Sequence, residues 1–164
     1  MSDRNFSQIR DKLADLFPAG APDVIFNTIH VVRSSTMPIG DDELLLPGMD
    51  EPPALGELGV EWSITGSRVK AHPELLVLTG DLLVRSSRHF TGVTVGAQLV
   101  FKDPERLDAV PLEETTTTYA PWASHVMYDV AAQSARALLS SVMVEGYLDP
   151  ITPIPTIRAM DETA

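Results

Sequence analysis

Histidine carries much of the acid–base chemistry near neutral pH and is a frequent metal ligand, and this chain has four: His30, His72, His89 and His125. No two of them lie three or four residues apart, so no two histidines on one helix face could bind the same metal ion. His125 and Asp129 are four residues apart, a spacing that would suit a base oriented by a carboxylate. The same spacing is more common in surface pairs, and we interpret this pair as one of them.

Other residue types that support catalysis or metal binding are also poorly placed. Ser124 adjoins His125, but adjacency alone makes no catalytic triad, and the Gly-x-Ser-x-Gly motif of a nucleophile elbow is absent. The acidic run 41–43 lacks calcium-loop spacing, and the glycines of 92–96 lie within a strand pattern. The chain has no cysteine, which excludes disulfides, thiol catalysis and cysteine-ligated metals. We therefore expect no enzymatic activity, no metal site and no cofactor.

The composition indicates a folded, acidic protein. Hydrophobic residues make up 44% of the 164 residues and charged residues 21%, as is ordinary for one domain. The formal net charge of −11 would repel nucleic acid and attract basic or unfolded cationic segments. No apolar run approaches the roughly 20 residues that span a bilayer, and the charged N-terminus lacks the apolar part of a signal peptide. We expect a cytoplasmic protein that binds neither nucleic acid nor membrane.

The first predicted element is a short amphipathic helix over residues 3–17. Its apolar residues recur at three- and four-residue steps along one face: Phe6, Ile9, Leu13 and Leu16. Asp3 would cap the start of this helix. Two prolines and a glycine within residues 18–22 would end it.

A sheet is predicted next, with strands over residues 24–33, 59–69, 75–85 and 90–101. In the second strand Val60, Trp62 and Ile64 share one side, an alternation typical of a half-buried strand. Short connections between the last three strands favour antiparallel pairing. Residues 34–59, which contain four prolines, are predicted to form a long loop, and the polar residues 102–118 are predicted to be irregular.

A long helix is predicted over residues 121–145. Pro121 suits its first turn, and Gly146 is expected to end it. One side of the helix carries a wide apolar stripe with small residues, which permits close approach of a sheet or another helix. Three prolines predict an extended tail over 147–164. The sequence as a whole, residues 1–164, predicts a single α+β domain, a four-stranded antiparallel sheet packed by one long C-terminal helix, with an added short N-terminal helix.

Residues 135–148 form the most distinctive motif of the chain. They read Ala-Arg-Ala-Leu-Leu-Ser-Ser-Val-Met-Val-Glu-Gly-Tyr-Leu, and Ile151, Pro153 and Pro155 follow. This motif resembles the end of the long helix in the SecB family of export chaperones. That family shows Ala-Arg, an aliphatic residue, a hydroxyl residue and Ser, then Gly with an aromatic or aliphatic pair, and an extended stretch that ends near Pro.

The resemblance implies a dimer of dimers, with long helices sandwiched between sheets, which holds unfolded polypeptide in apolar grooves without ATP. The wide stripe on helix 121–145 agrees, because one four-stranded sheet would leave part of it uncovered. We expect these residues at the oligomer interface: Trp122, Val126, Val130, Ala137, Leu138 and Ser141. We expect these residues to bind peptide: Trp62, Tyr147, Leu148, Ile151 and Ile154.

The sequence also departs from that family. A second helix follows the extended stretch in the family, whereas this chain has nine residues after Pro155. Thr94 stands at the best match for an acidic residue through which the family contacts the export motor. These departures weaken a role in export more than a role as a chaperone.

Three functions remain open at this point. The first is an ATP-independent chaperone for unfolded or precursor polypeptides, with the export motor as a further partner. The second is a SecB-like adaptor or antitoxin-type chaperone dedicated to one partner protein. The third is a small-ligand-binding or enzymatic domain that uses the Trp62 face as its pocket.

Overall fold

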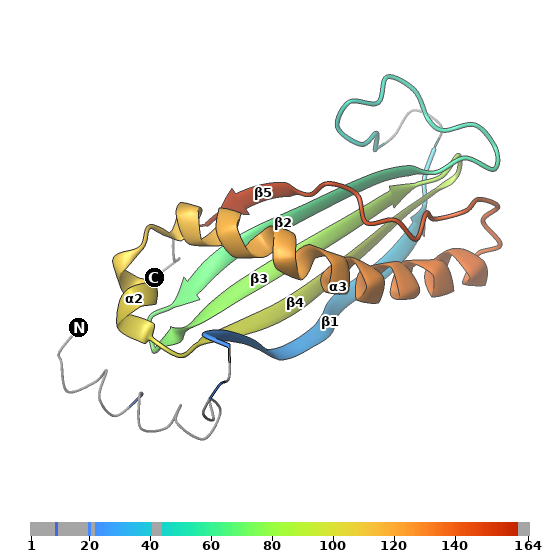
Figure 1. The fold of residues 1–164 in the computed structure, drawn as a ribbon. Helices are drawn as coiled ribbons and strands as arrows, with labels where there is room; N and C mark the ends of the chain where they lie inside the picture. The colour runs from blue at the N-terminus through green and yellow to red at the C-terminus, as the bar shows by residue number, and fades with distance from the viewer. Residues whose placement is uncertain (1–8, 10–19, 21, 41–43, 161–164) are drawn as a thin grey trace.

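The computed structural model of the chain describes residues 9, 20, 22–40 and 44–160. Four strands come first along the chain, two helices follow, and a short fifth strand comes last (Figure 1), so the predicted α+β class is confirmed. The elements are β1 (Val24–Pro38), β2 (Gly59–Val69), β3 (His72–Arg85), β4 (His89–Phe101), α2 (Pro104–Ala109), α3 (Leu112–Ser141) and β5 (Thr156–Ala159).

The strands form one sheet in the order β1-β4-β3-β2-β5. The first four strands pair antiparallel with their neighbours, as the sequence predicted. β5 adds a fifth strand, parallel to β2, within the tail that we predicted to be extended. It forms after Pro155 because the residues that follow have the backbone N–H groups that proline lacks.

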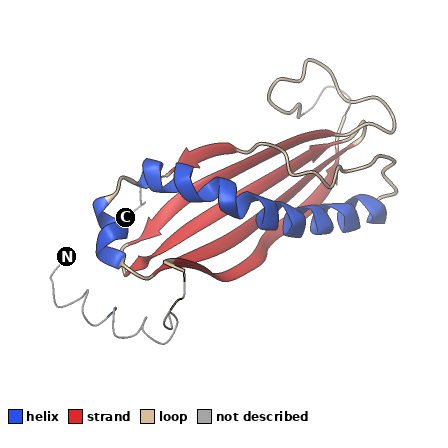
Figure 2. Cartoon of the chain, viewed as in Figure 1, coloured by secondary structure: helices blue, strands red, loops and turns tan. Residues whose placement is uncertain are grey.

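The core lies between the sheet and α3, which crosses one face of the sheet (Figure 2). Every second strand residue points toward α3, and the following are buried there: Trp62, Ile64, Leu76, Leu78, Leu82, Val84, Val93, Val95, Ala97 and Leu99. α3 contributes mostly small side chains to this layer: Ala120, Ala123, Ala131, Ala132 and Ala135. Small residues allow the helix to lie close to the strands.

β1 is longer than the strand predicted over 24–33. Residues 34–38 continue the strand and pair with residues 89–93 of β4. Pro38 is tolerated because it is the last residue of an edge strand, where its missing N–H breaks no ladder inside the sheet. The loop predicted over 34–59 is therefore shorter and begins at Ile39.

α3 begins at Leu112, so the predicted start at Pro121 is wrong. Pro121 lies inside the helix, and α2 occupies part of the segment 102–118 that we predicted to be irregular. Near the start of α3, threonine hydroxyls donate to carbonyls four residues earlier: Thr115 to Pro111, Thr116 to Leu112 and Thr118 to Glu114. Burial of Thr115 and Thr116 against the sheet outweighs the weak helix propensity of threonine.

α3 ends at Ser141, earlier than the predicted end at 145. Met143 adopts the left-handed conformation (φ 52°) that commonly closes a helix, a role we had predicted for Gly146. Gly146 (φ 143°) instead approaches the β1–β2 loop, where it bridges to Gly56 and a Cβ would lie 2.8 Å from Leu58. The tail is thereby placed beside that loop.

Arg85, the last residue of β3, anchors the β1–β2 loop. Its side chain is fully buried, and its guanidinium donates to the backbone carbonyls of Gly40, Leu44 and Ser86. Such charge-assisted bonds replace the water that a buried cation loses. Leu46 of the same loop is also buried, so the Pro-rich loop packs onto the end of the sheet.

Parts of three predictions lie outside the described residues: most of the N-terminal helix 3–17 with its cap Asp3, the acidic run 41–43, and the tail beyond residue 160. Ile9 is the described residue of the N-terminal segment, and it is helical. It packs on the sheet face opposite α3, in a small apolar group with Ile25, Leu75 and Val100.

Candidate polypeptide-binding surface

Trp62, a predicted peptide-binding residue, lies in the core. Its side chain is 2% exposed, and its Nε1 donates to Ser124 Oγ of α3 at 2.9 Å. The Tyr128 ring packs edge-on against it, with ring centroids 5.7 Å apart. Leu148, another predicted contact, is also buried. In this conformation neither Trp62 nor Leu148 is open to a ligand, and the Trp62 face is closed by α3.

The outward side of α3 carries the six residues predicted at an oligomer interface, which we name the helix surface. Two are half-buried and four are exposed: Val130 and Leu138, then Trp122, Val126, Ala137 and Ser141. The Trp122 ring packs on Phe26 of β1, with centroids 4.7 Å apart. α3 thus buries one side on the sheet and leaves a second, largely apolar side uncovered in the single chain. The interface role of this surface stays a prediction.

Residues 147–155, which we name the strap, lie along α3 and are fastened to it by polar groups. The contacts are Tyr128 OH donating to the Asp149 carbonyl at 2.8 Å, Arg136 donating to the Leu148 carbonyl at 3.3 Å, and His125 Nδ1 lying 2.8 Å from Thr152 Oγ1. Within the strap, Asp149 accepts a hydrogen bond from the Ile151 N–H at 2.8 Å. Besides these polar contacts, Leu148 is buried in the core, whereas Tyr147, Ile151 and Ile154 are left unburied.

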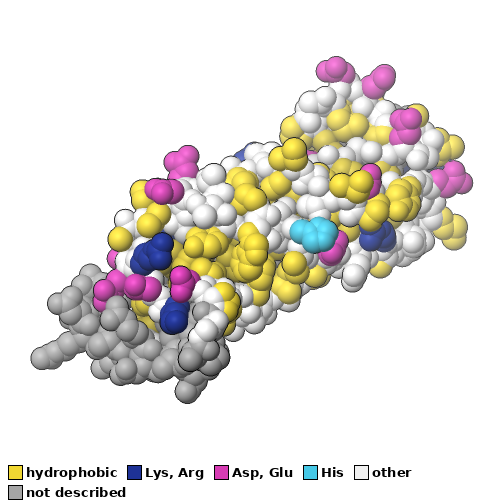
Figure 3. Space-filling model, viewed as in Figure 1, with side chains coloured by type: hydrophobic (Ala, Val, Ile, Leu, Met, Phe, Trp, Pro, Cys, Tyr) yellow, Lys and Arg dark blue, Asp and Glu magenta, His cyan; other side chains and the backbone are white. Residues whose placement is uncertain are grey.

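The strap turns three of its four large apolar side chains to solvent. Tyr147, Ile151 and Ile154 are 77%, 73% and 96% exposed. Met143, just before the strap, is exposed as well. Figure 3 shows hydrophobic side chains gathered along this face of the molecule, over α3 and the strap. A contiguous apolar patch of this kind marks an interaction site, whereas single exposed residues do not. Three of the five predicted peptide-binding residues are therefore accessible on one short segment.

Tyr128 connects the strap to the core. Its ring packs on Trp62 and its hydroxyl bonds to the strap, and the side chain is buried. Burial raises the pKa of Tyr128 above its ordinary value of 10.0; Arg136 opposes the rise, and Asp149 and Asp129 add to it. The phenol is therefore held in its neutral, hydrogen-donating form.

The sheet face opposite α3 carries a polar network around Thr94. Arg33 Nε donates to Thr94 Oγ1 at 3.1 Å, and Thr94 Oγ1 donates to Asp81 Oδ1 at 2.5 Å. Thr94 is the position at which the SecB family resemblance would place an acidic residue. The carboxylate that does lie there, Asp81, is already engaged with Thr94 and lies near a cation.

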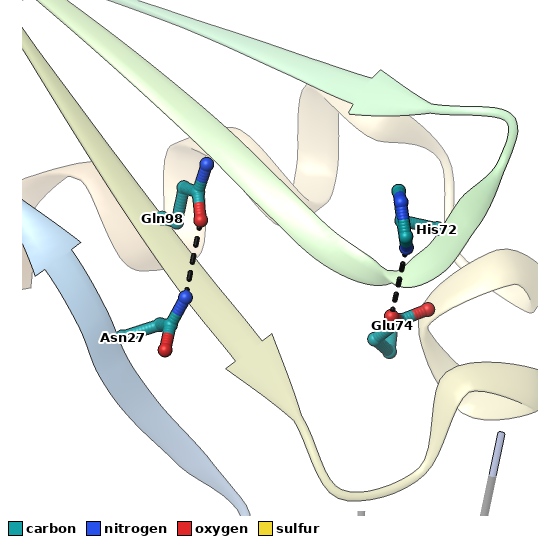
Figure 4. A network of polar contacts seen from close by, with 4 residues as sticks. All are labelled: Asn27, His72, Glu74 and Gln98. Carbon is teal, nitrogen blue, oxygen red and sulfur yellow. Dashed lines mark hydrogen bonds and ion pairs between the residues drawn. The ribbon is translucent and has the colours of Figure 1, made fainter. Parts of the chain in front are cut away.

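The histidines do not converge on one site. His125 Nε2 lies 3.8 Å from Asp129 Oδ2, with both side chains exposed. His72 Nδ1 lies 3.2 Å from Glu74 Oε1 at the β2–β3 hairpin (Figure 4). Figure 4 also shows Asn27 of β1, whose side-chain amide donates to Gln98 Oε1 of β4. Within the residues that the structure describes, no three His, Asp or Glu side chains are grouped to hold a metal ion.

None of the described helices is both long and apolar enough to cross a bilayer.

A cavity of about 580 Å³ lies where α2 and the start of α3 meet the start of β1 and the end of β4. Its lining mixes aromatic and charged side chains, among them Phe101, Lys102, Arg106 and Tyr119. This cavity was not predicted from the sequence, because the α2 segment was predicted to be irregular.

Sequence reasoning also missed the residues that fasten the strap. His125 was weighed only against Asp129, and Arg136 only as part of the motif 135–148. The available signal was that the polar residues at 125, 128 and 136 share one side of an α-helix, given its 100° step per residue. Without knowing that the tail folds back, this polar side reads as a solvated face.

Comparison with known proteins supports the fold. No protein-family model and no curated protein matches the sequence. Among solved structures, the chain is similar to the Mycobacterium tuberculosis Rv1957 SecB-like chaperone in complex with a ChAD peptide from the Rv1956 HigA1 antitoxin. The TM-score is 0.53 at 13% sequence identity, and the match covers 93% of this chain and 98% of that chain. The chain therefore has the fold of a SecB-like chaperone, as the motif at the end of its long helix predicted.

Proposed function

We propose that this protein is a SecB-like chaperone that binds unfolded or extended polypeptide at the strap, without ATP and without chemistry of its own. The observation that carries the proposal is the exposure of Tyr147, Ile151 and Ile154 on a segment that polar groups fasten to α3. Apolar side chains displayed in this way offer the non-directional contact that unfolded chains require. The likeness to a SecB-like chaperone solved with an antitoxin peptide supports a polypeptide ligand.

The charge distribution supports the same kind of ligand. Among the described residues, the β1–β2 loop exposes Asp50, Glu51 and Glu57, and the segment from the end of α3 into the strap exposes Glu145 and Asp149. Neither residues 44–58 nor residues 137–157 contain a lysine or arginine. The two segments meet where Gly56 bridges to Gly146. An acidic surface beside apolar side chains attracts unfolded segments that carry basic residues, and this attraction weakens as salt increases.

Self-association is part of the proposal. The helix surface is apolar and uncovered in the single chain, and a second subunit would bury it, as in the dimer of dimers that the family resemblance implies. The measurement is solution mass by light scattering, with four times 17.8 kDa expected for a tetramer. A monomer at all accessible concentrations would remove this part and leave the strap available for polypeptide binding.

The test of the function is suppression of aggregation of a chemically unfolded client, followed by light scattering. The wild-type protein is expected to suppress aggregation near stoichiometric ratio, and Ile151→Ser/Ile154→Ser is expected to suppress it much less. Val32→Ser is the control, because Val32 is 57% exposed on β1, at the opposite edge of the sheet from β5. If the wild-type protein neither suppresses aggregation nor binds unfolded chains, the proposal is wrong.

A dedicated partner is the second candidate, and the Thr94 network favours it over a role in export. Asp81, the carboxylate beside Thr94, accepts a hydrogen bond from Thr94, which in turn accepts one from Arg33, so it is already engaged within the sheet at the position where the family resemblance would place a contact with an export motor. Affinity capture from the native host distinguishes the two. A single enriched protein would indicate a dedicated partner, whereas many unrelated polypeptides would indicate a general chaperone.

A further inference from the structure

The outer edge of β2 is only partly paired. β3 pairs with β2 from Gly59 to Val69, but on the other side β5 pairs only with residues 63–66. Beyond β5, the Met160 N–H donates to the Gly66 carbonyl at 2.9 Å. Residues 60–62 have no strand partner on this side within the described chain. Such an edge presents N–H and C=O groups in position to pair with a further strand.

β5 is held to this edge mainly through its backbone. It has four residues, of which Thr156, Arg158 and Ala159 are exposed and Ile157 is half-buried against the core. Parallel pairing is slightly less stable per residue than antiparallel pairing. The strap that leads into β5 contains three prolines, which cannot donate to a ladder. Another polypeptide can make the same backbone bonds, because they do not depend on side chains.

We propose that β5 is an internal competitor for the client, and that an extended client segment replaces it as a strand parallel to β2. The inference rests on the proposed function, because it assigns how the polypeptide is bound. Pairing through the backbone accepts many sequences, as a chaperone for unfolded chains requires. In the register of β5, residues 60–62 would lie opposite residues 153–155 of the strap, where Pro153 and Pro155 cannot donate to a ladder. A client strand that displaces these residues together with β5 gains bonds along residues 60–62 that the protein's own tail does not make.

The register of β5 specifies which client segment fits. Ile157 is paired with Ile64, whose side chain points into the core. The client residue that replaces Ile157 then faces the same core, so an aliphatic residue is preferred there, and its two neighbours face away from it. The part of the strap that is fastened to α3 through residues 148, 149 and 152 stays in place, so the exposed Tyr147 and Ile151 remain available to the same client. The preferred client is therefore an extended segment with an aliphatic residue between polar neighbours.

A reversible lock on β5 tests the inference. Ser63 and Thr156 are register partners on β2 and β5, and the chain has no cysteine, so Ser63→Cys/Thr156→Cys creates a unique disulfide. The bond holds β5 in place when oxidised and releases it under dithiothreitol. Free-thiol titration verifies each state. The probe is labelled, reduced and carboxymethylated α-lactalbumin, which stays unfolded, and its affinity is measured by fluorescence anisotropy. Ser63→Cys alone is the control for the reductant.

The oxidised double variant is expected to bind the probe roughly ten-fold more weakly than the same protein after reduction. Ile157→Ser, which weakens β5 without a lock, is expected to bind more tightly than wild type. Equal affinity of the oxidised and reduced forms would overturn the inference and leave the proposed function standing. If the wild-type and reduced proteins both fail to bind the probe, the proposed function fails and the inference fails with it.

Discussion

The sheet and the strap both pack on α3, but they are held there by different kinds of contact. The sheet-facing side is apolar and close-packed: at Gly80 a Cβ would collide with the Trp62 ring and lie 3.1 Å from Met127 Cε. The strap is fastened by three side-chain polar contacts, and three of its apolar residues are open to water. Burial therefore stabilises the first region, whereas the second retains apolar surface.

This difference means that the sheet-facing side of α3 contributes mainly to stability, whereas the strap on another side of the same helix keeps apolar surface for binding. Buried apolar area contributes about 25 cal/mol per Å² to folding, and the strap contributes little of it through Tyr147, Ile151 and Ile154. Hydrogen bonds that fix a backbone without burying side chains provide order at small net stability. A segment held in this way keeps its apolar side chains for a partner. The comparison predicts that substitutions on the two sides of α3 differ in which property they change.

The largest expected effect distinguishes the two tryptophans. Trp62→Ala removes a ring that is 2% exposed and bonded to Ser124, and we expect a loss of about 3–5 kcal/mol in unfolding free energy. Trp122→Ala is the matched control, because its ring is 52% exposed and packs mainly on Phe26, and we expect about 1 kcal/mol. Urea unfolding, followed by far-UV circular dichroism at a protein concentration at which light scattering gives the mass of a single chain, measures both without a contribution from contacts of Trp122 with a second subunit. Similar losses would break the distinction between a buried and an open side of α3.

A smaller effect distinguishes the two faces of the sheet. Gly80→Ala places a methyl group against Trp62 under α3, and we expect it to cost about 1–3 kcal/mol through overpacking. Gly92→Ala is the control, because its Cβ would meet only Leu83 Cδ2 at an ordinary 3.6 Å. We expect little change from it in the same urea titrations. A tolerated Gly80→Ala would show that α3 is packed less closely than its small residues indicate.

The sequence predicted the parts of the fold that periodicity along the chain decides. The alternation of β2 and the continuous apolar run of β3 identified both strands, and the motif at 135–148 indicated the SecB-like fold. The start of α3 was missed because burial of Thr116 beside Gly66 overrides a weak local propensity. β5 was missed because four residues carry no readable period, and its partner strand lies far earlier in the chain.

The candidate site divides in the same way. Prolines at 150, 153 and 155 predicted an extended tail, and Tyr147, Ile151 and Ile154 are indeed exposed there. Alternation placed Trp62 on the apolar side of its strand but did not show that α3 would cover that side. The burial of Leu148 depends on the fold-back of the strap onto Arg136 and Tyr128. Such long-range contacts leave no pattern in a single sequence.

The smallest expected effect tests the polar fastening of the strap. Tyr128→Phe removes the hydroxyl that donates to the Asp149 carbonyl and keeps the ring against Trp62. We expect a loss of about 0.5–1.5 kcal/mol at neutral pH, with faster cleavage within the strap by a dilute protease. Tyr147→Phe is the matched control, because its ring is 77% exposed, and we expect it to leave both measurements unchanged.

The same pair of variants gives a pH dependence whose sign follows from burial. Burial raises the pKa of Tyr128 above 10.0 in the folded chain, so the folded state keeps this proton to higher pH than the unfolded state does. The stability that the neutral phenol contributes is complete below pH 10.0 and falls as pH rises through the folded-state pKa. Unfolding free energy measured from about pH 9 to about pH 11 should therefore decline more steeply in wild type than in Tyr128→Phe. Parallel declines would show that the phenol is hydrated, and that the strap is attached more loosely than its contacts with α3 imply.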